Sequence, residues 1–202
     1  HSEKVLVMRI FITVLVLIFS LQSGTKADDI RDFEIEGMSI GDSLLDHMSE
    51  NEINKNIVEQ QYKNDKFIAV LLFSSNQLVN LYDALYIDFK KDDKKFIIEA
   101  FAAIIDYQKM PIDKCFEQKE KIVSELKSVM QNSSIQEDEI KHWRDTSGKS
   151  KVYRTSFEIK SYRFLPIEVS CFDWDKTMDY VDHLRVNIKS DEYNDWLKEA
   201  TQ

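Results

Sequence analysis

Hydrophobic and polar positions recur along the chain with two different periods, which divide it into predicted strands and helices. The most regular helical pattern covers residues 112–130, where apolar side chains recur every three or four positions between lysines and glutamates. Short apolar or alternating runs predict six strands, at residues 66–73, 81–89, 96–107, 152–159, 167–171 and 184–188. The pattern therefore predicts three strands, a long helix and three more strands.

Capping residues predict further helices near both ends of this array. Ser39 lies three residues before Asp42, and Ser49 lies three residues before Glu52. This spacing is typical of a helix start, so we expect two short helices or one broken one there, with the Ser39 hydroxyl accepting a backbone N–H near Asp42. Ser190 predicts the start of a final helix.

Strands that follow one another without intervening helices indicate the fold class, because parallel strands need long crossovers and antiparallel strands do not. We expect an α+β protein: a largely antiparallel sheet of about six strands with helices packed mainly on one face. Residues 131–150 are polar and contain Gly148, which predicts a long surface loop. No low-complexity linker interrupts residues 28–202, so a single domain is expected.

The first 27 residues differ from the rest. Arg9 precedes an uncharged run, Ile10 to Phe19, that is apolar except for Thr13, and Gln22, Ser23 and Gly24 follow it. This pattern is typical of a signal peptide, and the run is shorter than the roughly 20 residues that a membrane-spanning helix needs. We expect cleavage after Ala27, which leaves no stable membrane span; an uncleaved anchor is the alternative.

Charge narrows the classes of partner. The chain has a formal net charge of −9, and removing a basic leader makes the remainder more acidic. Nucleic acids and anionic membranes attract clustered lysine and arginine, so neither is expected to be a partner. The specific partner is unknown at this point, and a protein or a small solute is possible. No motif predicts a cofactor.

Two cysteines, Cys115 and Cys171, lie beyond the predicted cleavage site. Export would place them where thiols usually oxidise. Cys115 lies on the apolar side of the predicted long helix, and Cys171 shares a strand face with Ile167 and Val169. We therefore expect a Cys115–Cys171 disulfide between helix and sheet, with two separate buried thiols as the alternative.

Two short strings match hydrolase motifs without their required context. Residues 37–41 match G-x-S-x-G, which needs a buried strand running into it. Residues 41–44 spell GDSL, whose serine needs a D-x-x-H block, yet Tyr180 stands three residues before His183. We therefore predict no catalytic residue. An exported serine hydrolase using Ser39 or Ser43 is the alternative.

Other polar and aromatic clusters also predict no site. The three histidines beyond the leader form no i, i+4 pair that would indicate a zinc site; they are His47, His142 and His183. A run of acids lacks the glycine and closing glutamate of a calcium loop; its members are Asp173, Asp175, Asp179 and Asp182. We expect no metal, and we expect the tryptophans to pack in the core or at its rim; they are Trp143, Trp174 and Trp196.

Residues 29–46, DIRDFEIEGMSIGDSLLD, and the Cys-Phe-Asp-Trp string at 171–174 resemble exported proteins of AT-rich marine bacteria that carry no assigned activity. The resemblance covers most of the chain beyond the leader and implies a bacterial periplasmic or secreted location. It implies no cofactor and no catalytic residue. Together these patterns predict an exported, non-catalytic domain that binds a macromolecular partner or a small solute in the periplasm, through its sheet face or its long loop.

Overall fold

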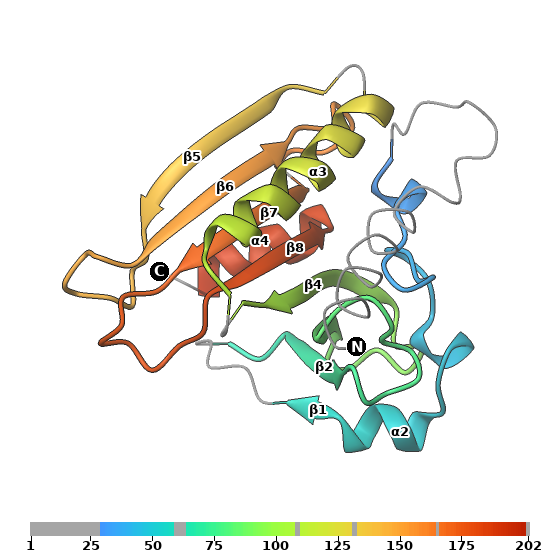
Figure 1. The fold of residues 1–202 in the computed structure, drawn as a ribbon. Helices are drawn as coiled ribbons and strands as arrows, with labels where there is room; N and C mark the ends of the chain where they lie inside the picture. The colour runs from blue at the N-terminus through green and yellow to red at the C-terminus, as the bar shows by residue number, and fades with distance from the viewer. Residues whose placement is uncertain (1–28, 59–63, 108–109, 131–132, 165, 201–202) are drawn as a thin grey trace.

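Eight strands form one antiparallel sheet in the order β1-β2-β3-β4-β8-β7-β6-β5 (Figure 1). This computed structural model describes residues 29–58, 64–107, 110–130, 133–164 and 166–200. The strands are β1 (Ile57–Val58), β2 (Phe67–Phe73), β3 (Ala84–Lys90), β4 (Ile98–Asp106), β5 (Ile135–Lys141), β6 (Lys151–Phe157), β7 (Ile167–Asp173) and β8 (His183–Lys189). The helices are α2 (Glu50–Lys55), α3 (Asp113–Val129) and α4 (Asp191–Ala200), with short 3-10 helices at Ile30–Asp32 and Leu44–Asp46. The expected α+β class and antiparallel pairing are confirmed.

The sheet has eight strands, not about six, and the difference lies in two weakly patterned segments. β5 lies inside residues 131–150, which were expected to form a loop. β5 is an edge strand that pairs with β6, and its side chains are almost all exposed on both faces. Without a buried face it shows no hydrophobic alternation, the signal on which strand prediction depends. β1 is only two residues long.

The main core lies on one face of the sheet, beneath α3 and the N-terminal segment 29–56. Buried side chains of α3 recur at helical spacing, which explains the amphipathic pattern; they are Cys115, Ile122, Val123 and Leu126. Cys115 is bridged to Cys171 of β7 with a Cα–Cα distance of 5.9 Å, so the structure confirms the expected pairing. The long helix is thereby fastened to the centre of one half of the sheet.

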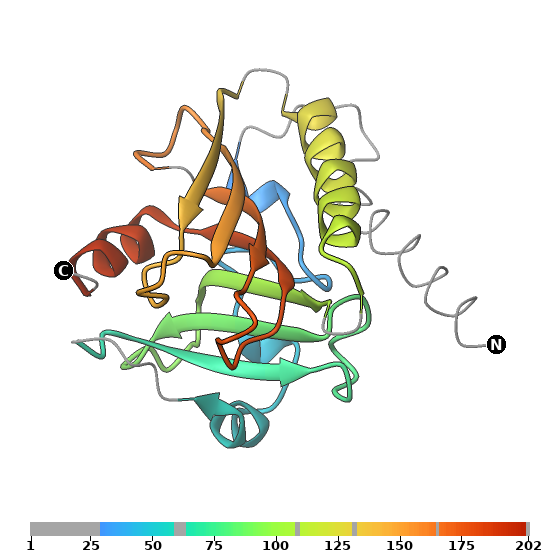
Figure 2. The ribbon, with the colours of Figure 1, turned by 60° about the vertical axis from the view of Figure 1, so that its left-hand side comes forward.

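The last helix lies on the opposite face, which corrects the expectation that helices pack mainly on one side (Figure 2). Trp196 of α4 packs on Phe67 of β2, with ring centroids 5.1 Å apart. Ala100 belongs to this small cluster, whereas the next residue, Phe101, belongs to the main core. Successive side chains of a strand point to opposite faces, so α3 and α4 sandwich the sheet.

The predicted caps have mixed outcomes. Ser49 forms a capping box with Glu52 at the start of α2, and the Ser190 hydroxyl accepts the Tyr193 N–H at the start of α4. The Ser39 prediction is wrong: its hydroxyl donates to the Phe33 carbonyl, and no helix begins there. Residues 35–38 instead form a tight turn, in which Gly37 has a φ of 79° that favours glycine.

The leader lies outside the described residues, so the expected signal peptide and its cleavage site are not placed. Over the parts of the chain that the structure does describe, no helix is long and apolar enough to cross a bilayer.

Candidate functional site

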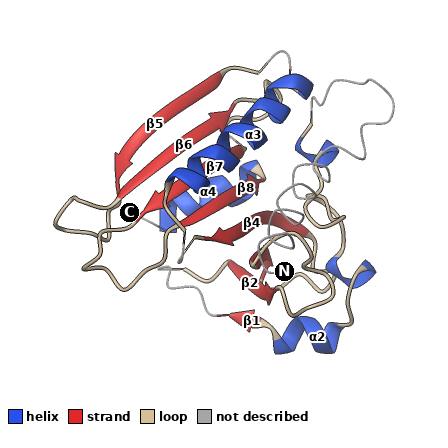
Figure 3. Ribbon diagram, in the orientation of Figure 1, coloured by secondary structure: helices blue, strands red, loops and turns tan. Residues whose placement is uncertain are grey.

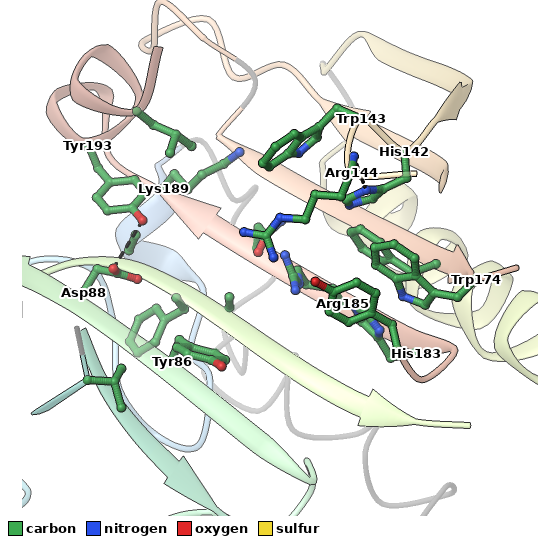
Figure 4. A pocket seen from close by; sticks show the side chains of 18 residues that line it. Tyr86, Asp88, His142, Trp143, Arg144, Trp174, His183, Arg185, Lys189 and Tyr193 are labelled. Atoms are coloured by element: carbon green, nitrogen blue, oxygen red, sulfur yellow. Dashed lines mark hydrogen bonds between the residues drawn. The ribbon is translucent and has the colours of Figure 1, made fainter. Parts of the chain in front are cut away.

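A pocket of about 690 Å³ lies on the face of the sheet opposite α3 (Figure 4). Strands β3, β4 and β8 form its floor, α4 borders one end, and the β5–β6 and β7–β8 loops border the other. Its lining comprises Val58, Tyr86, Asp88, Ala100, Phe101, Ala102, His142, Trp143, Arg144, Phe172, Trp174, Tyr180, His183, Arg185, Asn187, Lys189, Tyr193 and Leu197. A pocket of this size accommodates a small organic ligand.

Strand β8 supplies four of the polar side chains. Its core-facing residues are aliphatic, and the alternate positions face the pocket with His183, Arg185, Asn187 and Lys189. This arrangement follows from the period-two geometry of a strand whose two faces have different surroundings. The sequence pattern therefore defined both faces of β8, but the aliphatic one alone was used to predict the strand.

The two bordering loops lie at the same end of the sheet (Figure 3), and a hydrogen bond joins them. Ser150 is fully buried; its hydroxyl donates to the Asp145 carboxylate at 2.7 Å and accepts the Asp175 N–H at 2.9 Å. Asp145 also accepts the N–H groups of Ser147 and Ser150. Side-chain hydrogen bonds from Ser147 and Ser150, together with these backbone bonds, hold the pKa of the Asp145 carboxyl well below its usual range. The network positions the β5–β6 loop, which carries His142, against the β7–β8 loop.

Aromatic rings from both loops and from β7 form a connected cluster beside the pocket. The Trp174 ring lies 4.2 Å from His142 and 4.4 Å from Tyr180, measured between centroids. Phe172 stacks on His183 at 4.4 Å with an interplanar angle of 12°. Trp143 is 79% exposed and stacks on His142. Large exposed aromatic groups beside a pocket are typical of binding surfaces.

The hydrogen bonds of the two histidines define their neutral tautomers. The His183 Nδ1–H donates to the Val181 carbonyl at 2.8 Å, which leaves Nε2 as an acceptor. His142 has the opposite arrangement, because its Nδ1 accepts the Arg144 N–H and a proton is left for Nε2. Burial, assisted by Arg185, lowers the pKa of His183 to about 4. Burial and the positive charges of Arg144 and Arg185 also lower the pKa of His142.

Two arginines place positive charge at the centre of the pocket, in a chain whose net charge is negative. Figure 4 shows Arg144 reaching from the β5–β6 loop toward Arg185 of β8. The Arg144 guanidinium lies over the Trp143 ring at 4.9 Å, and the Arg185 guanidinium lies over the Phe172 ring at 4.8 Å. Within the described part of the chain no carboxylate pairs with Arg144.

Two buried polar atoms at the aromatic end make no hydrogen bond to the described residues. They are the His183 Nε2, an acceptor, and the Trp174 Nε1–H, a donor. Buried polar groups are nearly always paired, because an unmade hydrogen bond costs about 1 to 3 kcal/mol. Their presence in a pocket lining therefore favours a site that a bound group completes.

The serines of the hydrolase alternative lie outside this pocket. Ser39 donates to the Phe33 carbonyl at 3.2 Å, and Ser43 donates to the Lys95 carbonyl at 2.7 Å while it accepts the Leu45 N–H. Neither hydroxyl contacts a histidine in the described residues. Both serines have local structural partners, which explains the two motif matches as turn chemistry.

The acidic run before His183 has separate roles. Asp182 accepts the Trp174 N–H at 2.8 Å, and Asp175 accepts from Thr177. Across the residues that could be described, no group of three or more potential ligands could hold a metal ion.

Sequence reasoning considered several pocket residues singly but did not assemble them. His142, His183, Trp143 and Trp174 were each noted, whereas the arginines were not. Of the tryptophans, only Trp196 is buried in a hydrophobic cluster. One signal was available: the polar positions that alternate with the aliphatic ones in β8.

Comparisons of this chain with known protein families, with curated proteins and with solved structures found no match to any of them.

Proposed function

We propose that this protein is a non-catalytic binding protein that holds a small organic anion in the pocket on the α4 face of its sheet. The observation that carries the proposal is the convergence of Arg144 and Arg185 in a pocket lined with aromatic rings. Guanidinium groups bind carboxylates and phosphates through paired N–H donors. The pocket gathers cationic donors although the chain as a whole is acidic.

The remaining donors suit the same class of ligand. The His142 Nε2–H and the Trp174 Nε1–H add neutral donors at the aromatic end, near the arginines. Lys189 is already ion-paired with Glu168, so its charge is largely compensated. A ligand anion would thus be held chiefly by Arg144 and Arg185, with neutral N–H groups beside them.

The lining residues favour binding over covalent catalysis. They include no serine, threonine or cysteine that could act as a nucleophile. His183 has its pKa lowered to about 4 by burial, which makes it a weak base near neutral pH.

We propose further that the protein works outside the cytoplasm, in a bacterial periplasm or as a secreted protein. The disulfide supports this location, because the cysteines of most cytosolic proteins are kept as reduced thiols. The hydrophobic leader supports it independently. N-terminal sequencing of protein recovered from the periplasm or medium should find Asp28 as the first residue; a start at Met8 or before would contradict cleavage.

The binding proposal is tested by titrating the 15N-labelled protein with benzoate and with benzamide, its uncharged counterpart. Each tryptophan gives its own indole N–H signal, so the signal of Trp174 should shift while that of Trp196, in the α4 cluster, stays in place. We expect benzoate to bind at least tenfold more tightly than benzamide. Equal binding of the two would overturn the proposal.

Variants separate the pocket charge from the overall charge. Arg144→Met should weaken benzoate binding about tenfold, since a charge-assisted pair is worth about 1.5 kcal/mol or more. Arg31→Met removes another exposed positive charge, which pairs with Asp29 away from the pocket, and it should leave the affinity unchanged. Labelling of Ser39 or Ser43 by a fluorophosphonate probe would instead support a hydrolase.

A further inference from the structure

We infer that the ligand is a planar aromatic acid that also carries a hydrogen-bond donor on its ring, such as a hydroxyaryl carboxylate. This inference rests on the proposed function and specifies the ligand of the same pocket. It is drawn from how the guanidinium groups and rings are arranged, and from the acceptor at the aromatic end.

The arginine side chains are placed over ring faces. Arg185 lies over Phe172 and Arg144 lies over Trp143, with 4.8 and 4.9 Å from guanidinium carbon to ring centroid. The Arg144 guanidinium, which lies over Trp143 and pairs with no carboxylate in the described residues, offers its N–H edge to an anion, and Arg185 adds positive charge beside it. A carboxylate bound at that edge lies in the guanidinium plane, beside the aromatic layer.

Planarity of the ligand follows from that binding geometry. In an aryl carboxylate the ring and the carboxylate are conjugated and nearly coplanar, so the ligand ring continues the layer and contacts the faces of neighbouring rings. In a saturated ring acid the carboxylate is attached to a tetrahedral carbon, which turns the ring out of the layer. The exposed Trp143 ring at the rim, 79% accessible, offers one such contact face.

The donor follows from His183. This residue is 9% exposed, its Nδ1–H is held by the Val181 carbonyl, and its Nε2 accepts no hydrogen bond from the described residues. Three of the nearby polar groups on the rings and loops are donors only: the Trp174 indole, the His142 Nε2–H and the Arg144 guanidinium. The Tyr180 hydroxyl can donate or accept, but it makes no hydrogen bond to the His183 Nε2 in this structure. A ligand with oxygens alone would satisfy these donors and leave the His183 acceptor unpaired. A ring hydroxyl supplies the missing hydrogen.

The test compares five probes by the same indole-detected titration: benzoate, 3-hydroxybenzoate, 4-hydroxybenzoate, cyclohexanecarboxylate and galacturonate. We expect benzoate to bind at least fivefold more tightly than cyclohexanecarboxylate or galacturonate. The better hydroxybenzoate isomer should bind about tenfold more tightly than benzoate. If the saturated acid or the sugar acid binds as well as benzoate, planarity is overturned, whereas the anion site itself stands.

The hydroxyl contact has its own variant pair. His183→Phe keeps a ring stacked on Phe172 but removes the acceptor, so the tenfold preference for the hydroxybenzoate should disappear. His183→Gln keeps an amide oxygen as acceptor and should retain part of that preference; it also serves if the phenylalanine variant does not fold. A preference that survives unchanged in either variant would overturn this assignment. These outcomes can be told apart from a failure of the proposed function, because in that case benzamide would bind as tightly as benzoate.

Discussion

At the scale of single residues, His183 shows how burial fixes a protonation state. The ring lies between β8 and the stacked Phe172, and one nitrogen donates to a backbone carbonyl. The charge of Arg185 opposes a second positive charge nearby. Burial and that charge both favour the neutral imidazole, so the residue acts as a hydrogen-bonding group and not as a cation near neutral pH.

We predict that His183 makes the folded protein less stable in mild acid. Its pKa is lowered to about 4 in the folded state, so the unfolded chain takes up the proton first as the pH falls below about 6.5. The contribution of neutral His183 to the free energy of unfolding is complete above pH 6.5 and is lost as the pH falls from 6.5 to 4. At pH 5 the loss is about 2 kcal/mol. Urea unfolding at several pH values should show this: the stability of the wild type relative to His183→Phe should fall by about 2 kcal/mol between pH 7 and pH 5. A constant difference would contradict the assignment.

Ser150 is predicted to act on the pocket through the loops. Ser150→Ala removes the hydroxyl that joins Asp145 to the Asp175 N–H, which frees the β5–β6 loop from the β7–β8 loop. We expect a stability loss of about 1 to 2 kcal/mol and weaker benzoate binding, because His142 and Arg144 lose their support. Thr146→Ala, an exposed position in the same loop whose side chain is not part of this network, is the control and should change neither quantity much. Unaltered benzoate binding by Ser150→Ala would show that the two loops keep their positions without the Ser150 hydrogen bonds.

At the scale of elements, a row of charges ties four strands together on the pocket face. Asp138 of β5 pairs with Arg154 of β6 at 3.1 Å, and Arg154 pairs with Glu168 of β7 at 3.4 Å. Glu168 also pairs with Lys189 of β8, and both of those side chains are only 12% exposed. Through Asp138, these ion pairs connect the exposed strand β5 to β6, although β5 has no hydrophobic alternation that would fix its position in the sheet.

We predict that Glu168 carries most of the stability in this row. Glu168→Gln leaves Arg154 and Lys189, whose side chains are mostly buried, without their shared carboxylate. Removing one partner of a buried pair is costly, and partial exposure reduces the effect, so a loss of about 2 kcal/mol is expected. Glu117→Gln breaks the exposed pair with Lys114 and should cost less than about 0.5 kcal/mol. Comparable small losses for both variants, by urea unfolding, would assign the row no special role.

At the scale of the whole molecule, the disulfide joins the two kinds of secondary structure across the main core. It links α3 to β7, across 56 positions of sequence. On β7 the next residue, Phe172, points to the other face and lines the pocket. The bond therefore anchors the strand behind the aromatic cluster.

We predict that the Cys115→Ala/Cys171→Ala protein unfolds at lower urea concentration. Opening a loop of this length restores unfolded-chain entropy worth about 4 kcal/mol, and native-state strain reduces that figure. Wild-type protein unfolded with a reductant should shift in the same direction. Equal midpoints for bridged and cysteine-free protein would show that the bond adds no stability.

The sequence by itself determined the elements with a strong hydrophobic pattern. β2, β3, β4, β6, β7 and β8 were predicted from short apolar or alternating runs, and α3 because its apolar positions follow the helical period. Cys115 and Cys171 could be paired for the same reason, since each lies on the core side of its own element. These are local patterns, readable within a few residues.

Tertiary structure alone decided the strand order, the side on which α4 packs, and the pocket. β4 pairs with β8, and β5 forms an edge strand through its pairing with β6. This order brings His142 and Arg144, from the loop after β5, to Arg185 and His183 of β8. Polar positions on a strand look alike in sequence whether they face water or a shared pocket. Whether such a position faces water or a pocket depends on which distant strands become neighbours. The strand order in turn depends on the apolar area that the whole sheet buries.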